Sequence, residues 1–223
     1  MTSAALVLHT RKYADDRLIV ETYTEAAGTV SFIVRINHGG RKGNVPHTLF
    51  QPLALLDISW PDNTRSSLAK PTAARLLTGH DSFSMTHDPI KSALTLFLAE
   101  FFRAVLRQEP PSPPIFRYIA ESVRWLNLAD GRPLANVHLA ILIRMALLLG
   151  IRPTAEELLP ICPAAHREAI PALLRMNLAN QHLYKFTRSQ RAELLRIILL
   201  YYKEHIPAFP EIKSVEVLSL IFV

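Results

Sequence analysis

Residues 29–36 read TVSFIVRI, and the alternation of apolar and polar side chains in this stretch decides the fold of the first part of the chain. Val30, Phe32 and Val34 share one face of an extended backbone, whereas Thr29 and Arg35 share the other. A period of two residues is typical of a β-strand that is buried on one face. The stretch therefore predicts a half-buried strand with a mostly polar outer face.

The same alternation recurs on both sides of this strand. It is found around Leu6 and Leu8, in residues 18–24 (LIVETYT), in residues 54–60 (ALLDISW) and, more weakly, in residues 64–70. Turn residues separate these runs at positions 14–16, 27–28, 37–46 and 61–63. Five short antiparallel strands predict a small closed barrel, because closure removes exposed strand edges.

From Pro71 onward the apolar period changes to 3.6 residues, which predicts helices. Asp88-Pro89 and Ser112-Pro113 each combine an N-cap residue with a proline at the first helical position. Further helices are expected over residues 134–149, over 188–205 after a Thr187–Gln190 capping box, and over 213–222. The predicted fold class is α+β, with a barrel domain over residues 1–80 and a helical domain over residues 81–223.

The composition favours some classes of protein and excludes others. The 223 residues include 25 Lys and Arg against 19 Asp and Glu, which gives a formal net charge of +6 and favours polyanionic partners. The single cysteine, Cys162, excludes an intramolecular disulfide and a multi-cysteine zinc site, as is typical of a reducing compartment. Neither a signal peptide nor a long apolar span is evident, so we expect a cytoplasmic protein with no membrane partner.

Motifs of common enzyme classes are absent from the sequence. It contains no GxGxxG, GxxxxGK[ST], GxSxG or HExxH, and its nine histidines are scattered singly. His138, in the most apolar stretch, is more typical of a satisfied core histidine than of a metal ligand. The sequence therefore predicts a protein that is not an enzyme and has no metal or other cofactor.

The positive signal is the loop of residues 35–47, RINHGGRKGNVPH, which carries Arg35, Arg41 and Lys42 and no acidic residue. Loops of small five-stranded barrels commonly bind nucleic-acid backbones, and outward aromatic rings stack on bases. The first turn is bordered by further candidates, namely Arg11, Lys12, Tyr13, Arg17 and Tyr23. The alternative is that this loop is a solvated hairpin. A second acid-free region, residues 169–192, has a solvated helix face as its alternative.

Several long stretches resemble one protein family. They are residues 5–34 (ALVLHTRKYADDRLIVETYTEAAGTVSFIV), 49–60 (LFQPLALLDISW), 88–109 (DPIKSALTLFLAEFFRAVLRQE) and 173–222, within which residues 201–218 (YYKEHIPAFPEIKSVEVL) match best. In this order they resemble the RecO family of bacterial DNA repair and recombination mediators, over nearly the whole chain.

This resemblance implies an oligonucleotide-binding (OB) barrel joined to a helical domain. It also implies binding of single- and double-stranded DNA, annealing of complementary strands, and binding to the acidic, phenylalanine-ended tail of the single-stranded-DNA-binding protein. With RecR, such proteins help to load the RecA recombinase. We expect phosphate contacts from Arg11, Lys12, Arg17, Arg35, Arg41 and Lys42, stacking by Tyr13 and Tyr23, and tail contacts from Arg144 and Arg152.

Two features depart from the family pattern. Many members carry a four-cysteine zinc module, whereas this chain has only Cys162, so we expect no zinc. Residues 159–173 also form a shorter connection than the family usually has. A rival hypothesis from another class remains open, in which the chain is a protein-interaction adaptor whose barrel binds an acidic protein. That rival predicts partner binding without strand annealing.

Overall fold

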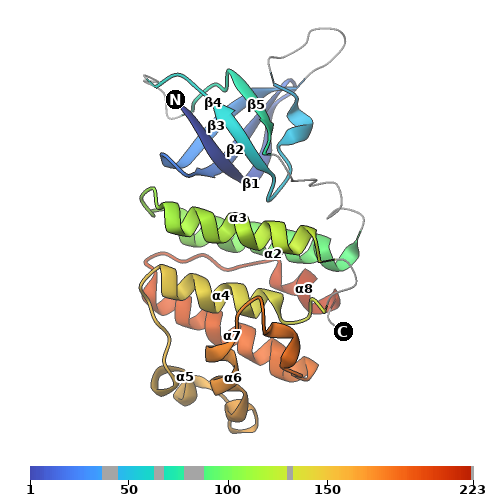
Figure 1. The fold of residues 1–223 in the computed structure, drawn as a ribbon, viewed down its shortest axis with the longest axis vertical. Helices are drawn as coiled ribbons and strands as arrows, with labels where there is room; N and C mark the ends of the chain where they lie inside the picture. The colour runs from blue at the N-terminus through green and yellow to red at the C-terminus, as the bar shows by residue number, and fades with distance from the viewer. Residues whose placement is uncertain (37–44, 63–67, 78–87, 130–132, 222–223) are drawn as a thin grey trace. The chain divides into compact units, whose positions relative to one another are not determined.

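The computed structural model describes residues 1–36, 45–62, 68–77, 88–129 and 133–221 (Figure 1). These residues form two compact units, Met1–Leu128 and Ala129–Val223, and each is described by itself. The expected boundary between residues 80 and 81 falls in the stretch 78–87, which lies outside the described residues. That boundary stays a prediction.

The first unit contains a five-stranded antiparallel sheet in the order β3-β2-β1-β4-β5. Its strands are β1 (Thr2–Ala14), β2 (Arg17–Thr24), β3 (Gly28–Arg35), β4 (Leu55–Ser59) and β5 (Ala73–Leu76). In β3, Phe32 and Val34 are buried while Thr29 and Arg35 are exposed, as the alternation predicts. The barrel core is formed chiefly by Val7, Val20, Phe32, Phe50, Leu56, Ile58 and Trp60.

The sheet is not closed by a continuous ladder, which corrects the expectation of a closed barrel. An isolated parallel bridge joins the edge strand β3 to Ala69, which precedes β5: Ala69 O accepts a hydrogen bond from Ile33 N, and Ala69 N donates one to Ser31 O, both at 2.9 Å. The fifth strand was also expected too early, because β5 begins only after Pro71. Proline has no N–H for a ladder, so the strand starts beyond it, and residues 64–67 of the expected run lie outside the described residues.

Two helices complete the first unit, α2 (Pro89–Leu106) and α3 (Pro113–Asn127). The predicted N-cap of α2 is confirmed, since the Asp88 carboxylate accepts hydrogen bonds from Ile90 N at 2.8 Å and Lys91 N at 3.2 Å. A bidentate ion pair between Arg103 of α2 and Glu21 of β2, with contacts of 2.6 and 2.9 Å, ties helix to sheet. The OB-type sheet is therefore packed as one body with these helices.

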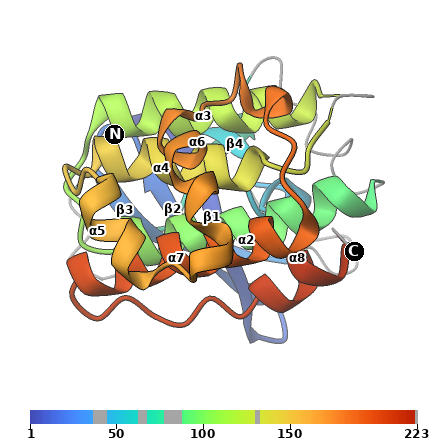
Figure 2. The same cartoon turned by 90° about the horizontal axis from the view of Figure 1, so that it is seen from below.

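In the described part of the second unit, every regular element is a helix. Its elements are α4 (Val137–Leu148), α5 (Ala155–Ile161), η2 (Ala164–Ala169), α6 (Ile170–Arg175), η3 (Gln181–Leu183), α7 (Arg188–His205) and α8 (Val215–Ile221), while η1 (His47–Leu49) belongs to the first unit. Most of α4 is apolar and buried, with Arg144 among its few exposed residues, and α7 packs beside it (Figure 2). The predicted capping box at Thr187 is confirmed, and Gly150, just beyond α4, has a positive φ of +81°, which is typical of a glycine that ends a helix. The α+β fold class is thus confirmed.

Candidate nucleic-acid interface and a pocket in the helical unit

The turn between β1 and β2 forms a cationic tip on the first unit. The last residues of β1 are all exposed, including Arg11, Lys12 and Tyr13, and the Tyr13 side chain is 59% accessible. Arg17 begins β2 and is paired in register with Arg35 at the end of β3. The sheet therefore brings five of the predicted contact residues to one end of three adjacent strands. We call Arg11, Lys12, Tyr13, Arg17 and Arg35 the barrel tip.

Carboxylates partly neutralise the charge of this tip. Lys12 Nζ lies 3.8 Å from Asp15, and Asp16 lies 3.5 Å from Arg17 Nε and 3.2 Å from Arg35 Nε. Arg11 forms no ion pair with any residue that the structure describes. All of these side chains are about half exposed or more, so solvent weakens each pair. The cations thus remain accessible to a polyanion.

Two further predicted contacts, Arg41 and Lys42, lie outside the described residues. Tyr23 is described, and the expectation that its ring faces outward is wrong. Its side chain is completely buried, and its hydroxyl donates to Pro110 O at 2.9 Å and accepts from Ser112 N at 3.1 Å. Burial also raises the pKa of this phenol. Tyr23 therefore joins the sheet to the segment before α3, and Tyr13 is the stacking candidate that the geometry retains.

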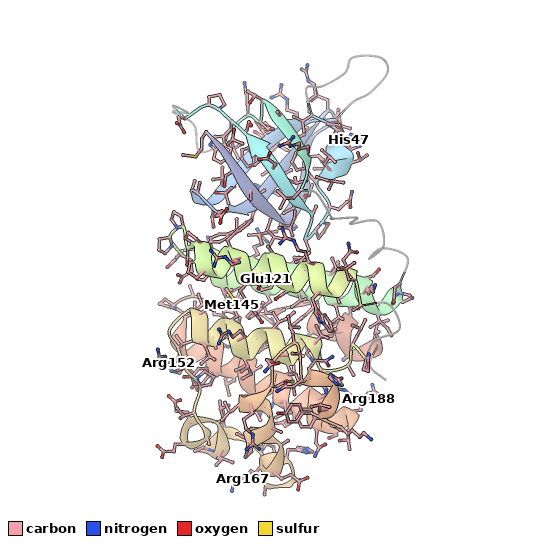
Figure 3. The ribbon with its side chains drawn as sticks, viewed as in Figure 1. His47, Glu121, Met145, Arg152, Arg167 and Arg188 are labelled. Carbon is pink, nitrogen blue, oxygen red and sulfur yellow. The ribbon has the colours of Figure 1, made fainter. Side chains whose placement is uncertain are left out.

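Arg144 and Arg152, expected to bind a partner's acidic tail, are both exposed in the second unit. Neither lines the pocket found in that unit. Figure 3 places Arg152 on the opposite side of the unit from Arg188, which does line it.

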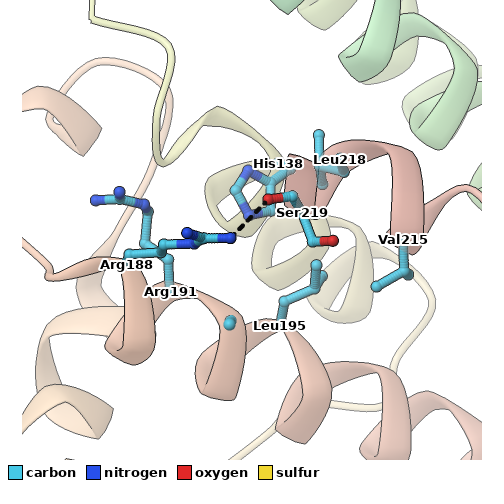
Figure 4. A pocket seen from close by; sticks show the side chains of 8 residues that line it. His138, Arg188, Arg191, Leu195, Val215, Leu218 and Ser219 are labelled. Atoms are coloured by element: carbon cyan, nitrogen blue, oxygen red, sulfur yellow. Dashed lines mark hydrogen bonds between the residues drawn. The ribbon is translucent and has the colours of Figure 1, made fainter. Parts of the chain in front are cut away.

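The pocket lies between α7 and α8, with His138 of α4 at its side (Figure 4). It encloses about 450 Å³ of empty space, including its open mouth. Two helical stripes form its walls: Arg188, Arg191, Ala192 and Leu195 on α7, and Val215, Leu218 and Ser219 on α8. Leu195 and Leu218 are buried and make the interior apolar, whereas the two arginines lie at the N-terminal end of α7. The result is an apolar cavity with a cationic rim.

The rim carries positive charge that no described carboxylate pairs directly. Arg188 Nη2 lies 3.5 Å from Ser219 O, and Arg191 donates to Phe186 O, so both arginines contact backbone carbonyls. The first turn of α7 has no acidic residue, and its capping box uses Gln190, which donates to Glu168 at 3.3 Å. A helix N-terminus adds positive potential of its own. The rim is therefore suited to an anionic group.

Burial lowers the pKa of two of the titratable groups that line this cavity. Desolvation, followed by the charge of Arg191, lowers the pKa of the buried His138 to about 3, so its imidazole is neutral at pH 7. Desolvation also lowers the pKa of Arg191, which is an energetic sign that this guanidinium is partly removed from water. Its Nε is buried without a hydrogen-bond partner among the described residues. A bound carboxylate would therefore stabilise the positive charge of Arg191, because it would offer a hydrogen-bond acceptor to this partly desolvated guanidinium.

Sequence reasoning missed this pocket, although its signal was present. Arg188, Arg191 and Leu195 are spaced i, i+3 and i+7, which puts them on one face of a helix. In the sequence these two arginines indicate only an acid-free region, because folding alone brings the other wall, on α8, beside them.

The described residues do not suggest a metal site. Among them, no group of three His, Cys, Asp or Glu side chains could hold an ion. Cys162 is a buried free thiol whose pKa is raised by burial. The expected absence of zinc stays a prediction. Within the same part of the chain, each helix is too short or too polar to cross a membrane.

Known proteins match the chain over nearly its full length. The family model for the recombination protein O N terminal matches residues 1–80, and that for the recombination protein O C terminal matches residues 86–157. DNA repair protein RecO of Bacteroides fragilis is 34% identical over 241 residues, covering 99% of this chain and 98% of its own. The proteins of the same name from Phocaeicola vulgatus and Porphyromonas gingivalis are 33% and 28% identical, with coverage of at least 98% on both sides. The chain belongs to the RecO family of DNA repair proteins.

Proposed function

We propose that this protein binds single- and double-stranded DNA, anneals complementary strands and acts as a recombination mediator without catalysing a reaction of its own. In this proposal it works in the cytoplasm, at the nucleoid. With RecR and the single-stranded-DNA-binding protein, it helps to load RecA. Membership of the RecO family supports the general role in DNA repair.

The observation that carries the DNA-binding proposal is the barrel tip. Three strands bring Arg11, Lys12, Arg17 and Arg35 together beside the exposed ring of Tyr13. Basic side chains that contact phosphates release condensed counterions, which favours binding to any sequence. An exposed aromatic ring adds stacking on unpaired bases. These residues thus combine the two elements of sequence-independent strand binding.

Annealing follows from the same charge. Two strands repel each other through their phosphates, and a cationic surface that holds both lowers this repulsion. No nucleotide hydrolysis is needed for this step, because base pairing itself releases free energy. We therefore expect annealing in the absence of ATP.

Titration of a labelled single-stranded oligonucleotide at several salt concentrations tests the proposal. Replacing Arg35, Arg41 and Lys42 by alanine should weaken binding and reduce its dependence on salt. Affinity that responds neither to salt nor to these substitutions would reject the interface. The adaptor hypothesis would gain support if an acidic protein bound the tip while complementary strands annealed no faster with the protein than without it.

We propose in addition that the α4–α7–α8 pocket, rather than Arg144 and Arg152, binds the tail of the single-stranded-DNA-binding protein. An acidic tail ending in phenylalanine requires an apolar cavity for the ring and cations for the carboxylates. Leu195 and Leu218 supply the first requirement, and Arg188 and Arg191 supply the second. Figure 4 shows Arg188 hydrogen-bonded to Ser219, beside the space that Leu195 and Leu218 line.

A fluorescent peptide with the tail's sequence tests this second proposal. Leu218→Asp should abolish binding, because a carboxylate in the cavity repels the ligand and is itself desolvated. Leu220→Asp is a matched control, since Leu220 lies on the same helix but is 71% exposed and does not line the pocket. Equal losses in the two variants would point to damage of α8 rather than to a binding site.

A further inference from the structure

Asp16 occupies an unusual position at the barrel tip. Arg17 and Arg35 are directly paired across β2 and β3, and like charges in such a pair repel each other. The Asp16 carboxylate serves both: Oδ1 lies 3.5 Å from Arg17 Nε, and Oδ2 accepts a hydrogen bond from Arg35 Nε at 3.2 Å. One carboxylate thus bridges two guanidinium groups.

The backbone keeps this carboxylate at the site. Asp16 O accepts a hydrogen bond of 2.7 Å from Ile36 N, just beyond the end of β3. The residue is therefore tied to the same strand that carries Arg35. An incoming strand cannot remove Asp16 from the tip without breaking this bond. It can only displace the side chain.

We infer that Asp16 is an intramolecular competitor of the DNA phosphate and limits the affinity of the barrel tip. A carboxylate and a phosphate present similar oxygen acceptors to arginine, so they compete for the same N–H groups. This inference rests on the proposed function of the tip in DNA binding. A strand held by such a site is released more easily, which suits a protein that passes strands on.

An opposite role would be to position the two arginines for DNA. The exposure of the group argues against it, because the side chains of Arg17, Asp16 and Arg35 are 48, 44 and 58% accessible. Ion pairs this exposed fix side chains only weakly. The Asp16 carboxylate repels an approaching phosphate whether or not the arginine side chains are ordered. This repulsion therefore outweighs any positioning of the arginines.

The two neighbouring carboxylates offer a matched experiment. Asp16→Asn and Asp15→Asn remove the same charge one residue apart, but Asp15 is fully exposed and lies 3.8 Å from Lys12, whereas Asp16 bridges two arginines. Binding of a labelled single-stranded oligonucleotide is measured from about 50 to about 200 mM salt. We expect Asp16→Asn to raise affinity about three- to tenfold and to steepen the salt exponent by about one. Asp15→Asn should change affinity by less than about twofold.

The same titrations on Arg17→Ala and Arg35→Ala separate this inference from the proposed function. If these variants weaken binding but Asp16→Asn leaves it unchanged or weaker, Asp16 is not a competitor and the interface stands. If neither arginine matters, the interface itself is rejected. Equal gains from the two asparagine variants would overturn the inference, since net charge alone would explain them. In the double Arg17→Ala, Arg35→Ala background, the extra gain from Asp16→Asn should disappear.

Discussion

The barrel tip and the α4–α7–α8 pocket both contain arginines, but the partners of these arginines differ. At the tip, Arg17 and Arg35 are exposed and share the carboxylate of Asp16. In the pocket, Arg188 and Arg191 contact backbone carbonyls and border a buried, neutral imidazole. The tip is therefore a solvated and screened surface, whereas the pocket is a partly desolvated cavity.

This difference indicates different ligands. A screened surface whose cations are already paired suits a long polyanion, which gains affinity by making many weak contacts. The exposed Arg188 and the partly desolvated Arg191, beside an apolar cavity, suit a short ligand with one or two carboxylates, since a contact with Arg191 is less screened by water. We expect salt to weaken binding at the tip more steeply than at the pocket, and a single substitution to weaken binding more at the pocket than at the tip.

Charge reversal in the pocket should have the largest effect. Arg188→Glu combined with Arg191→Glu should weaken binding of the acidic tail peptide by roughly 100-fold, because two attractive contacts at the rim of the pocket become repulsive. Isothermal titration calorimetry measures the loss. The combined Arg144→Glu, Arg152→Glu variant carries the same change in charge and should keep nearly normal peptide affinity. A comparable loss in that variant would show that overall charge, not the pocket, binds the tail.

Neutralising the cations of the barrel tip should lower DNA affinity less per residue. It should also make the affinity clearly less dependent on salt. Arg11→Ala, Lys12→Ala and Arg17→Ala together should lower affinity for single-stranded DNA about 10- to 100-fold at low salt and reduce the salt exponent by about two to three. Peptide binding to the pocket should be unaffected. Loss of DNA affinity with an unchanged salt exponent would mean that these side chains do not contact phosphates.

Much of the fold could be predicted from the sequence, because its determinants are local. Asp88, Thr187 and Gly150 mark helix ends through their own backbone chemistry, and the alternation around Phe32 marks a strand. The last strand could not be placed, because β5 has only four residues and depends on pairing with β4. Pairing between distant segments leaves little trace in the sequence of such a short strand.

For the candidate sites too, the local features could be predicted from the sequence and those that depend on distant contacts could not. The cations of the tip were found because they are close in sequence and flank predicted turns. The burial of Tyr23 could not be foreseen, since its partners Pro110 and Ser112 are almost 90 residues away and only the tertiary fold brings them to its hydroxyl. The pocket was missed for the same reason, because its two walls lie on separate helices.

The dependence of the free energy of unfolding on pH tests how strongly His138, at the side of the pocket, is desolvated. The pKa of His138 is about 3 in the folded protein and 6.5 for an ordinary, solvated histidine, so between these values the unfolded chain binds the proton first. The stability contributed by the neutral imidazole is therefore complete above pH 6.5 and is lost as the pH falls toward 3. Between pH 6 and 5 the loss should be about 1 kcal/mol. His138→Asn should flatten this part of the pH profile in urea unfolding, and an unchanged slope would contradict the burial of the imidazole.

The smallest effect is expected from the aromatic ring at the tip, where it distinguishes stacking from charge. Tyr13→Ala should weaken single-stranded DNA binding by about 1 kcal/mol or slightly more, the lower end of a base-stacking contribution, because the residue is 59% exposed and its ring would stay partly in water. Tyr13→Phe keeps the ring and should bind normally. Double-stranded DNA, whose bases are already stacked, should bind both variants alike. A salt exponent that stays constant while the single-strand affinity falls would identify the contribution as stacking, and equal losses on both kinds of DNA would assign it to the backbone instead.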